Sequence, residues 1–188
     1  MTKRRVIVVT DGDRVAQRVV EKVAQNIGGR AISLSGGNPT QITGEKIAAL
    51  IKETPYDPVL VMVDDCGSSD RGEGERALEA LTRDSELEIL GVLAVASNTA
   101  AVGGVPVTVS VTRDGKIVEE SVNKDGNPKP GATKEIKGDT VDIINQLSIP
   151  VVIGIGDLGK MDEADRVTDG AKITTLAVQE ILRRNHGH

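Results

Sequence analysis

The sequence predicts an α/β fold with three layers around a mostly parallel central sheet, of the Rossmann-like or flavodoxin-like kind, with a β-hairpin insertion around 105–121. Short runs of apolar, β-branched residues alternate with amphipathic segments over most of the chain. Unbroken apolar runs are typical of strands that are buried on both faces of a parallel sheet. Because these runs alternate with helical patterns, we expect right-handed crossovers between parallel strands.

Apolar runs in the first half of the chain predict four strands, at residues 6–9, 31–34, 58–63 and 89–96. A helix after the first run is indicated by apolar residues at helical spacing, which are Val15, Val19, Val20, Val23 and Ile27. The pair Gly28-Gly29 ends this helix in the usual way. A second helix is expected after Thr43 as its N-cap, and a third is expected to bury Ala77, Leu78 and Leu81.

The middle of the chain has a different pattern. Residues 105–111 alternate between apolar and polar with period two, which is typical of a half-buried strand. Asp114-Gly115 is a hairpin-turn signal, and a return strand begins at Ile117. Residues 124–138 are rich in Gly, Pro and charge, and we expect them to form a loop.

The end of the chain returns to alternating strand and helix patterns. We expect a helix that starts at Asp139 or Thr140 and a last strand at residues 150–155. A closing helix is predicted to bury Ile173, Leu176, Ala177, Ile181 and Leu182. The whole is expected to be a single α/β domain over residues 1–184, with a flexible tail at 185–188.

Composition excludes several classes of function. The chain of 188 residues carries a net charge of −5 and contains no Phe or Trp, so it lacks the basic surface and the stacking platforms of a nucleic-acid binder. Cys66 is the single cysteine of the sequence, so no intrachain disulfide is expected. The apolar run after the basic start ends at Asp11, too short for a signal peptide, and the stretch 89–96 is far shorter than the roughly 18–20 residues of a membrane span.

Acidic residues follow three of the predicted strands. Asp11 and Asp13 come after the first, Asp64 and Asp65 after the third, and Asp157 after the last. In open parallel sheets, sites form beyond the carboxyl ends of the strands. We therefore expect the first, third and last strands to run side by side and to bring these carboxylates to a common edge.

Carboxylates packed closely repel one another unless a cation, shared protons or water lie between them. Hard cations such as Ca²⁺ or Mg²⁺ prefer such oxygen ligands. The predicted ligand-binding residues are Asp11, Asp13, Asp64, Asp65, Asp157 and Lys160, and the first four of these are the predicted metal ligands. The alternative is that each aspartate forms a turn or caps a helix.

Two further features have a plain structural alternative. Residues 154–161 fit both glycine-rich phosphate-loop patterns, but Met161 stands where a P-loop needs Ser or Thr, and Asp157 would face phosphate with the wrong charge. A tight strand-to-helix turn is the favoured interpretation. Cys66 follows two acidic residues, which disfavour a thiolate, and the histidines of the sequence are His186 and His188 in the tail. A half-buried structural cysteine is therefore expected.

Several longer segments occur in a characteristic order. They are Val9-Thr10-Asp11-Gly12-Asp13, Ile27-Gly28-Gly29-Arg30, Gly37-Asn38-Pro39-Thr40, residues 57–65, residues 94–99 and residues 154–161. Together they resemble the stage V sporulation protein AE family, the small soluble member of the SpoVA group of endospore-forming bacteria. The resemblance runs from about residue 4 to about residue 184.

The resemblance implies a role in sporulation and spore germination. SpoVA proteins are associated with moving dipicolinic acid, with its calcium, into the developing spore and out at germination. A member of this family is expected to be a non-enzymatic accessory component in the forespore or spore, soluble or peripheral at the inner membrane, with other SpoVA proteins as partners. The family carries no catalytic residues over to this chain, and a homo-oligomer stays open.

The residues themselves leave two alternatives to an accessory role. The first is a magnesium-dependent enzyme of phosphoryl or nucleotide chemistry, in which the four aspartates hold the metal and Lys160 contacts phosphate. The second is a receiver-like phospho-switch that uses the same cluster. Both require the aspartates to share one pocket.

Overall fold

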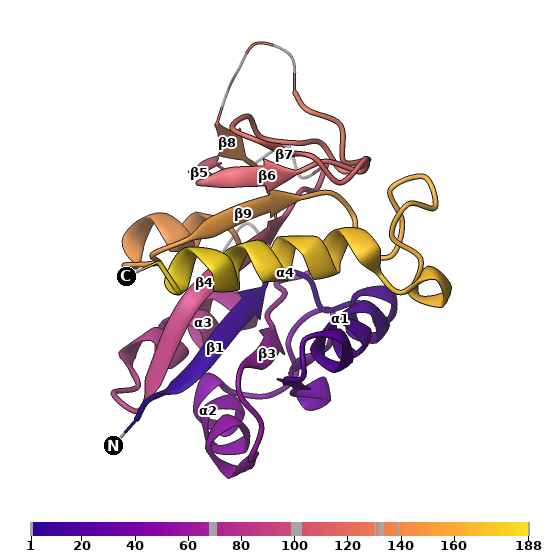
Figure 1. Cartoon of the computed structure of the whole chain (residues 1–188). Helices are drawn as coiled ribbons and strands as arrows, with labels where there is room; N and C mark the ends of the chain where they lie inside the picture. Colours follow the sequence, from indigo (N-terminus) through magenta and orange to yellow (C-terminus); the bar gives the residue numbers. More distant parts are fainter. Residues whose placement is uncertain are drawn as a thin grey trace.

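The computed structural model of the protein describes residues 2–67, 71–98, 103–129, 131, 134–138 and 140–187. Its centre is a seven-stranded sheet in the order β2-β3-β1-β4-β9-β6-β7 (Figure 1). The strands are β1 (Arg4–Val9), β2 (Arg30–Ala31), β3 (Val59–Met62), β4 (Leu87–Val95), β6 (Val109–Val111), β7 (Ile117–Val118) and β9 (Val152–Ile155). Neighbours pair in parallel, except for β6 with β7. The predicted helix start at Asp139 and the tail residue His188 lie outside the described residues.

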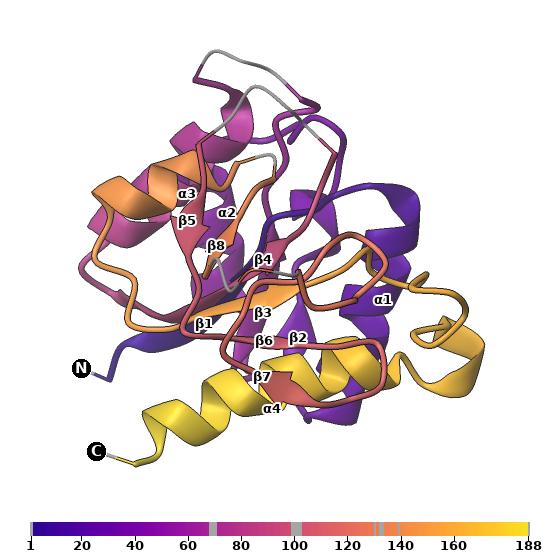
Figure 2. The same ribbon diagram turned by 90° about the horizontal axis from the view of Figure 1, so that it is seen from above.

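Helices cover both faces of this sheet, as the predicted three layers require (Figure 2). On one face lie α1 (Arg14–Asn26) and α4 (Lys172–Asn185). On the other lie α2 (Gly44–Glu53), α3 (Glu73–Arg83) and the 3₁₀ segment η2 (Asp142–Gln146). Two shorter 3₁₀ segments are η1 (Ser33–Ser35) and η3 (Val167–Asp169). The α/β fold class is confirmed.

The buried strands explain why the sheet forms the core. Val6, Ile7, Val8 and Val9 of β1 are fully buried because β1 has β3 and β4 on its sides and helices over both faces. Each fully buried side chain of this size contributes roughly 1.5–3 kcal/mol to folding. The unbroken apolar run at residues 6–9 therefore predicted a doubly covered strand correctly.

The strand order confirms one expectation about the site and corrects another. β1 and β3 are parallel neighbours, with Val9 opposite Met62 at their carboxyl ends. The last strand of the prediction, β9, is also parallel, but β4 lies between it and β1. The prediction that all three strands are adjacent was wrong for β9, because the long apolar strand β4 takes the place next to β1.

The predicted second strand is shorter than expected. β2 spans two residues, and the chain then enters η1. Ser35 explains the change: its hydroxyl donates to the carbonyl of Ile32 at 2.6 Å and accepts the N–H of Met62 at 2.9 Å. A serine side chain thus satisfies a backbone group of β3 that a longer strand would have satisfied.

The predicted hairpin is present and continues the central sheet. β6 pairs in parallel with β9 and antiparallel with β7, and the turn at Asp114-Gly115 is closed by a hydrogen bond from the Gly115 N–H to the Thr112 carbonyl at 2.9 Å. The beginning of the period-two segment leaves this sheet: β5 (Val105–Pro106) pairs with β8 (Glu135–Ile136). The strand β8 lies within the segment that was expected to be a loop.

Helices α1 and α2 begin at their predicted caps, whereas the helix expected from Asp139 or Thr140 is the five-residue 3₁₀ segment η2. Asp13 accepts the N–H of Ala16 at 2.8 Å and caps α1, and Thr43 accepts the N–H of Lys46 at 3.3 Å and caps α2. α4 continues through Asn185, which was expected to open the tail, because the Asn185 side chain donates to the carbonyl of Leu90 at 2.9 Å. No helix in the described part of the chain is long and apolar enough to cross a bilayer.

Candidate functional site

Acidic side chains gather in a pocket at the carboxyl ends of the parallel strands. The pocket has a volume of about 160 Å³ and is formed by residues at or beyond the ends of β1, β3, β4 and β9, together with Asn38 from the turn after η1. Its lining residues are Thr10, Asp11, Asp13, Asn38, Asp64, Val95, Ala96, Ser97 and Asp157. We call this cavity the acidic pocket. It brings together four of the six predicted ligand-binding residues.

Hydrogen bonds between neighbouring strand ends hold one side of the acidic pocket in place. The Thr10 hydroxyl accepts the N–H of Val95 at 3.0 Å and thereby joins β1 to β4. The Asp64 carboxylate accepts the N–H of Gly12 at 3.1 Å and thereby joins β3 to the loop after β1. Asp64 is buried, and its own N–H donates to the Thr40 hydroxyl at 2.8 Å. Its carboxylate is therefore fixed in position before any ligand arrives.

Two glycines allow the loops around the pocket to approach closely. A Cβ on Gly12 would lie 2.4 Å from the carbonyl oxygen of Gly37, which brings the turn with Asn38 against the end of β1. A Cβ on Gly156 would lie 2.6 Å from the backbone nitrogen of Gly126. The neighbouring Asp157 N–H donates to the carbonyl of Lys124 at 2.7 Å. Both contacts need residues without a side chain, because a Cβ at these distances would clash with backbone.

Asp11 is the carboxyl group that this environment perturbs most clearly. Burial first, and then the negative charges of Asp13, Asp64 and Asp157, together raise the pKa of Asp11 from 3.8 to about 7. The hydrogen bond that Asp11 accepts from the Asp13 N–H, at 3.2 Å, acts in the opposite direction on this pKa. Near neutral pH the pocket therefore holds a proton that a bound cation would displace.

Asp13 and Asp64 each combine a local role with a place in the pocket. Asp13 is the N-cap of α1, and Asp64 accepts the N–H of Cys66 at 2.9 Å in the turn after β3. Both interpretations therefore apply to these two residues: each forms a local turn or helix cap, and each also lines the shared site. A carboxylate has two oxygens with several lone pairs, so a backbone bond leaves it able to accept from a ligand.

Asp65 does not line the acidic pocket. Its Oδ1 accepts the N–H groups of Gly74 at 2.7 Å and Glu75 at 3.3 Å, in the first turn of α3. The residue at the N-cap position of this helix is Gly72, which has no side chain to offer, and Asp65 supplies the acceptor from the neighbouring strand end. Asp64 and Asp65 thus serve different places, the acidic pocket and the start of α3.

Lys160 and the glycine-rich segment do not form a phosphate loop. The Lys160 ammonium lies 3.6 Å from the Asp157 carboxylate and is about half exposed, outside the lining of the acidic pocket. Met161, Asp162 and Glu163 all have positive φ, and α4 begins at residue 172. A phosphate loop leads directly into a helix, and this segment does not. The prediction of a tight strand-to-helix turn was also wrong, because a longer series of turns lies between β9 and α4.

Cys66 is exposed, which corrects the expectation that it is half-buried. Its φ of 54° places it in the left-handed turn after β3, and its N–H donates to Asp64.

Sequence reasoning missed three residues that matter for this region. Asn38 and Ser97 line the acidic pocket, and the rule that sites lie beyond strand ends could have identified Ser97, which follows β4. Asp165 is fully buried and accepts from the Gly159 N–H at 2.8 Å, the Thr174 N–H at 2.9 Å and the Thr174 hydroxyl at 2.6 Å. It anchors the turns after Asp157 to the start of α4.

The arrangement suits a cation or a ligand that donates hydrogen bonds. The pocket offers carboxylate oxygens, the Thr10 and Ser97 hydroxyls and an amide, with room for about five water molecules by volume. Among the described residues no three Asp, Glu, His or Cys side chains are placed to coordinate a single metal ion. Any cation here would therefore keep part of its oxygen shell from water or from an accompanying anion.

Comparison with known proteins gives one clear relationship. The family model SpoVAE, described as stage V sporulation protein AE1, matches residues 5–185. Searches of curated proteins and of solved structures give no match. Because the family match covers nearly the whole chain, the sheet, the acidic pocket and the helices around them all lie within it. The chain belongs to the stage V sporulation protein AE1 family and is a sporulation-related SpoVA protein.

Proposed function

We propose that the protein is a non-enzymatic accessory component of the SpoVA apparatus that moves dipicolinic acid with its calcium. It acts in the forespore or spore, peripheral to the inner membrane, through contacts with other SpoVA proteins. Family membership supports the sporulation role. The acidic pocket supports the ligand part, in which Ca²⁺, alone or with dipicolinate, enters among Asp11, Asp13, Asp64 and Asp157.

The observation that carries the ligand part is the convergence of four carboxylates on one cavity. Negative charge held away from water is costly, and the raised pKa of Asp11 expresses that cost. A divalent cation removes it by replacing the proton. Ca²⁺ takes six to eight oxygen ligands in flexible geometry, so protein carboxylates, water and the carboxylates of dipicolinate can complete its shell together.

Titration calorimetry with Ca²⁺, Mg²⁺ and calcium dipicolinate tests this part. We expect heat with calcium or its dipicolinate complex, and loss of at least about tenfold in affinity for Asp64→Asn, because one fixed negative charge is removed. The matched control is Asp114→Asn, an exposed carboxylate in the hairpin turn. No heat at protein concentrations suited to millimolar affinity would remove the ligand part.

A separate experiment tests the partner part. The protein, isolated from spores under mild detergent conditions, is expected to bring other SpoVA proteins with it. Failure to co-purify any SpoVA member would end the accessory role, whatever the calorimetry shows.

A magnesium-dependent phosphoryl-transfer protein, as enzyme or as phospho-switch, is the second candidate. One observation favours it: Asp11, Asp13 and Asp64 share a pocket, as that chemistry requires. Lys160 is not among the lining residues and pairs with Asp157 at the margin of the pocket, so the lining offers no cation for a phosphate. Binding heat with Mg²⁺ and inorganic phosphate together, where neither alone gives any, would favour this candidate over the accessory protein.

A further inference from the structure

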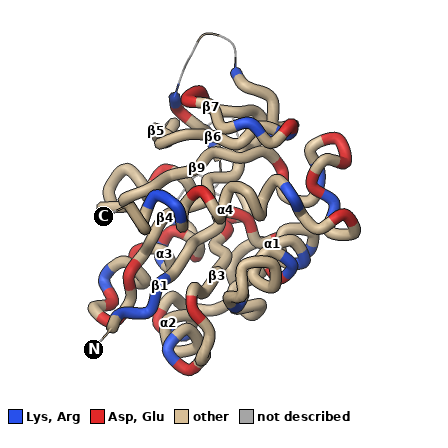
Figure 3. Tube along the Cα trace, viewed as in Figure 1, with Lys and Arg blue, Asp and Glu red and all other residues tan. Residues whose placement is uncertain are grey.

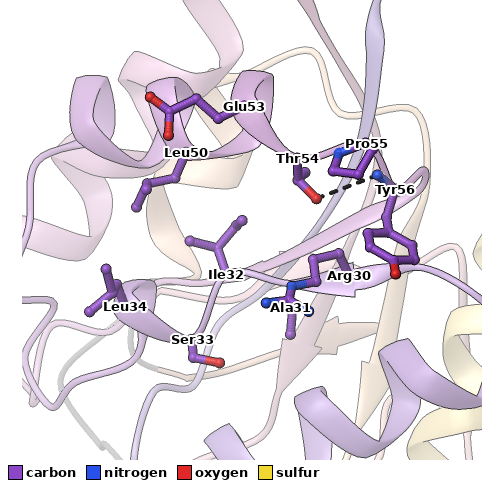
Figure 4. Close-up of a pocket in the computed structure, with 10 residues that line it drawn as sticks. All are labelled: Arg30, Ala31, Ile32, Ser33, Leu34, Leu50, Glu53, Thr54, Pro55 and Tyr56. Atoms are coloured by element: carbon purple, nitrogen blue, oxygen red, sulfur yellow. Dashed lines mark hydrogen bonds between the residues drawn. The ribbon is translucent and has the colours of Figure 1, made fainter.

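A larger cavity of about 460 Å³ lies away from the acidic pocket, along the open edge of the sheet (Figure 4). It is bounded by the edge strand β2, by η1, by the end of α2 and by the loop at residues 54–56. Ile32, Leu34, Leu50 and Tyr56 give it apolar walls, and Arg30 and Glu53 add one charge of each sign. We call this cavity the edge groove.

The edge groove exposes large apolar side chains, whose burial would be energetically favourable. Leu34 is 64% exposed and Tyr56 is 50% exposed. Tyr56 is also the one aromatic residue in the whole sequence, and it lies at the surface and not in the core. The Arg30 guanidinium lies 6.0 Å from the centre of the Tyr56 ring. Tyrosine and arginine, together with tryptophan, are enriched among the residues that contribute most of the binding energy at protein interfaces.

Both rims of the edge groove are held rigidly. Arg4 donates to the carbonyls of Thr54 and, at 2.8 Å, of Tyr56, and so fixes the loop that carries the tyrosine. On the other rim the Ser33 hydroxyl donates to Glu21 at 2.6 Å, which fixes the 3₁₀ turn that displays Leu34. Binding to a surface that is already ordered loses little conformational entropy.

The charges in the groove have no ionic partner among the described residues. Among the described residues, neither the Arg30 guanidinium nor the Glu53 carboxylate makes an ion pair or a side-chain hydrogen bond. Figure 4 shows Arg30 and Tyr56 at one end of the groove and Leu34 and Leu50 at the other, with Glu53 on α2. One unpaired cation and one unpaired anion on a single patch make that patch complementary to itself.

The backbone of β2 fits the same arrangement. The N–H groups of Arg30 and Ile32 bond to the carbonyls of Pro58 at 3.1 Å and Leu60 at 2.9 Å, both on the β3 side. Because successive residues of a strand face opposite sides, the N–H and C=O of Ala31 point to the open edge. Two copies of Ala31 related by a two-fold axis can exchange a reciprocal pair of hydrogen bonds.

We propose that the edge groove is a dimer interface in which a second copy of this chain binds by antiparallel pairing of β2 with its counterpart. The two-fold axis brings Arg30 of one copy to Glu53 of the other, twice, and sets each Tyr56 against the Leu34 and Leu50 end of the opposite groove. An interface of this kind must be self-complementary. In the groove, a two-fold rotation places the basic group of one copy against the acidic group of the other, and the tyrosine end of one copy against the leucine end of the other. The inference is independent of what the acidic pocket binds.

The test is the mass of the full chain in solution, by sedimentation equilibrium from micromolar to near-millimolar concentration. The wild type is expected to reach twice the mass of the 19.8-kDa chain. Arg30→Glu and Glu53→Arg are each expected to weaken the dimer at least about tenfold, because each creates two like-charge contacts. The double variant Arg30→Glu/Glu53→Arg restores both pairs with reversed polarity and is expected to dimerise like the wild type.

Matched controls are the exposed charge reversals Arg18→Glu on α1 and Glu88→Arg on β4, which should leave the mass unchanged. Tyrosine fluorescence adds a site-specific readout, since Tyr56 is the one intrinsic fluorophore of a chain without Trp, and its emission should change with dimer formation. A monomer at every concentration overturns the proposal. So does a dimer that folded single reversals leave intact, that the double variant fails to restore, or whose formation leaves the Tyr56 emission unchanged.

Discussion

Asp11 shows how one side chain connects the fold to its electrostatics. It follows directly from the buried strand β1, so the chain delivers a carboxyl group to a place with little water and with Asp13, Asp64 and Asp157 nearby. Burial and these charges raise its pKa to about 7. Between pH 3.8 and about 7 the folded protein keeps a proton that the unfolded chain releases. The stabilising contribution of that proton is complete below the lower value and is lost as the pH rises through the upper one.

Replacement of Asp11 by asparagine should therefore stabilise the protein in a pH-dependent way. Asp11→Asn is neutral at every pH and keeps an acceptor for the Asp13 N–H. We expect its free energy of unfolding to exceed that of the wild type by about 1–2 kcal/mol near pH 8, and the difference to shrink as the pH falls toward about 4. Urea unfolding at several pH values measures this. A difference that is equal at all pH values, or equal to that of Asp114→Asn, would contradict the assigned environment of Asp11.

At the scale of elements, two acidic residues that lie outside a helix accept hydrogen bonds from its first turn. Asp65 accepts from the first turn of α3, and Asp165 accepts from Thr174 in the first turn of α4. Neither helix has a side-chain cap of its own: Gly72 and Ala171 occupy the N-cap positions. Negative charge is favourable at a helix N-terminus, so each carboxylate stabilises its helix and also ties it to a strand end or a turn.

Loss of the Asp165 carboxylate should destabilise the protein strongly. Asp165→Ala removes the acceptor of the buried Thr174 N–H and of the half-buried Gly159 N–H. We expect a loss of about 2–4 kcal/mol in the free energy of unfolding. The control Asp169→Ala removes an exposed ion pair with Arg166, and about 0.5 kcal/mol or less is expected. If thermal or urea unfolding gives both variants the same stability, Asp165 is not the anchor of this segment.

At the scale of the whole molecule, the sequence was informative wherever apolar periodicity decides the outcome. The apolar runs at residues 6–9 and 59–62 became buried parallel neighbours, which brought Asp11 and Asp13 to the same edge as Asp64. The order of the strands could not be read from the sequence, because β4 and β9 both contain apolar runs of a buried parallel strand and either could lie beside β1. The role of Asp65 at the start of α3 could not be predicted, because this helix has a glycine at the N-cap position, where a capping side chain normally stands.

The arrangement of charge over the molecule follows from the same division of roles. Figure 3 shows acidic and basic residues interspersed along the helices and loops. Many exposed pairs, such as Arg5 with Asp57 at 2.7 Å, contribute about 1 kcal/mol or less each. The carboxylates of the acidic pocket differ because the fold holds them together without a basic residue in the lining. The pocket is thus the place where a cation would change the energy of the folded state most.

The carboxyl pKa of Asp11, measured by carbon-13 NMR in buffer without divalent cations and again with saturating Ca²⁺, tests this account most directly. The account predicts a pKa of about 7 without the cation and a clear fall when Ca²⁺ displaces the proton. A pKa near 3.8 without cation would contradict the convergence of the four carboxylates in a desolvated pocket. A raised pKa that Ca²⁺ leaves unchanged would contradict the binding of calcium there.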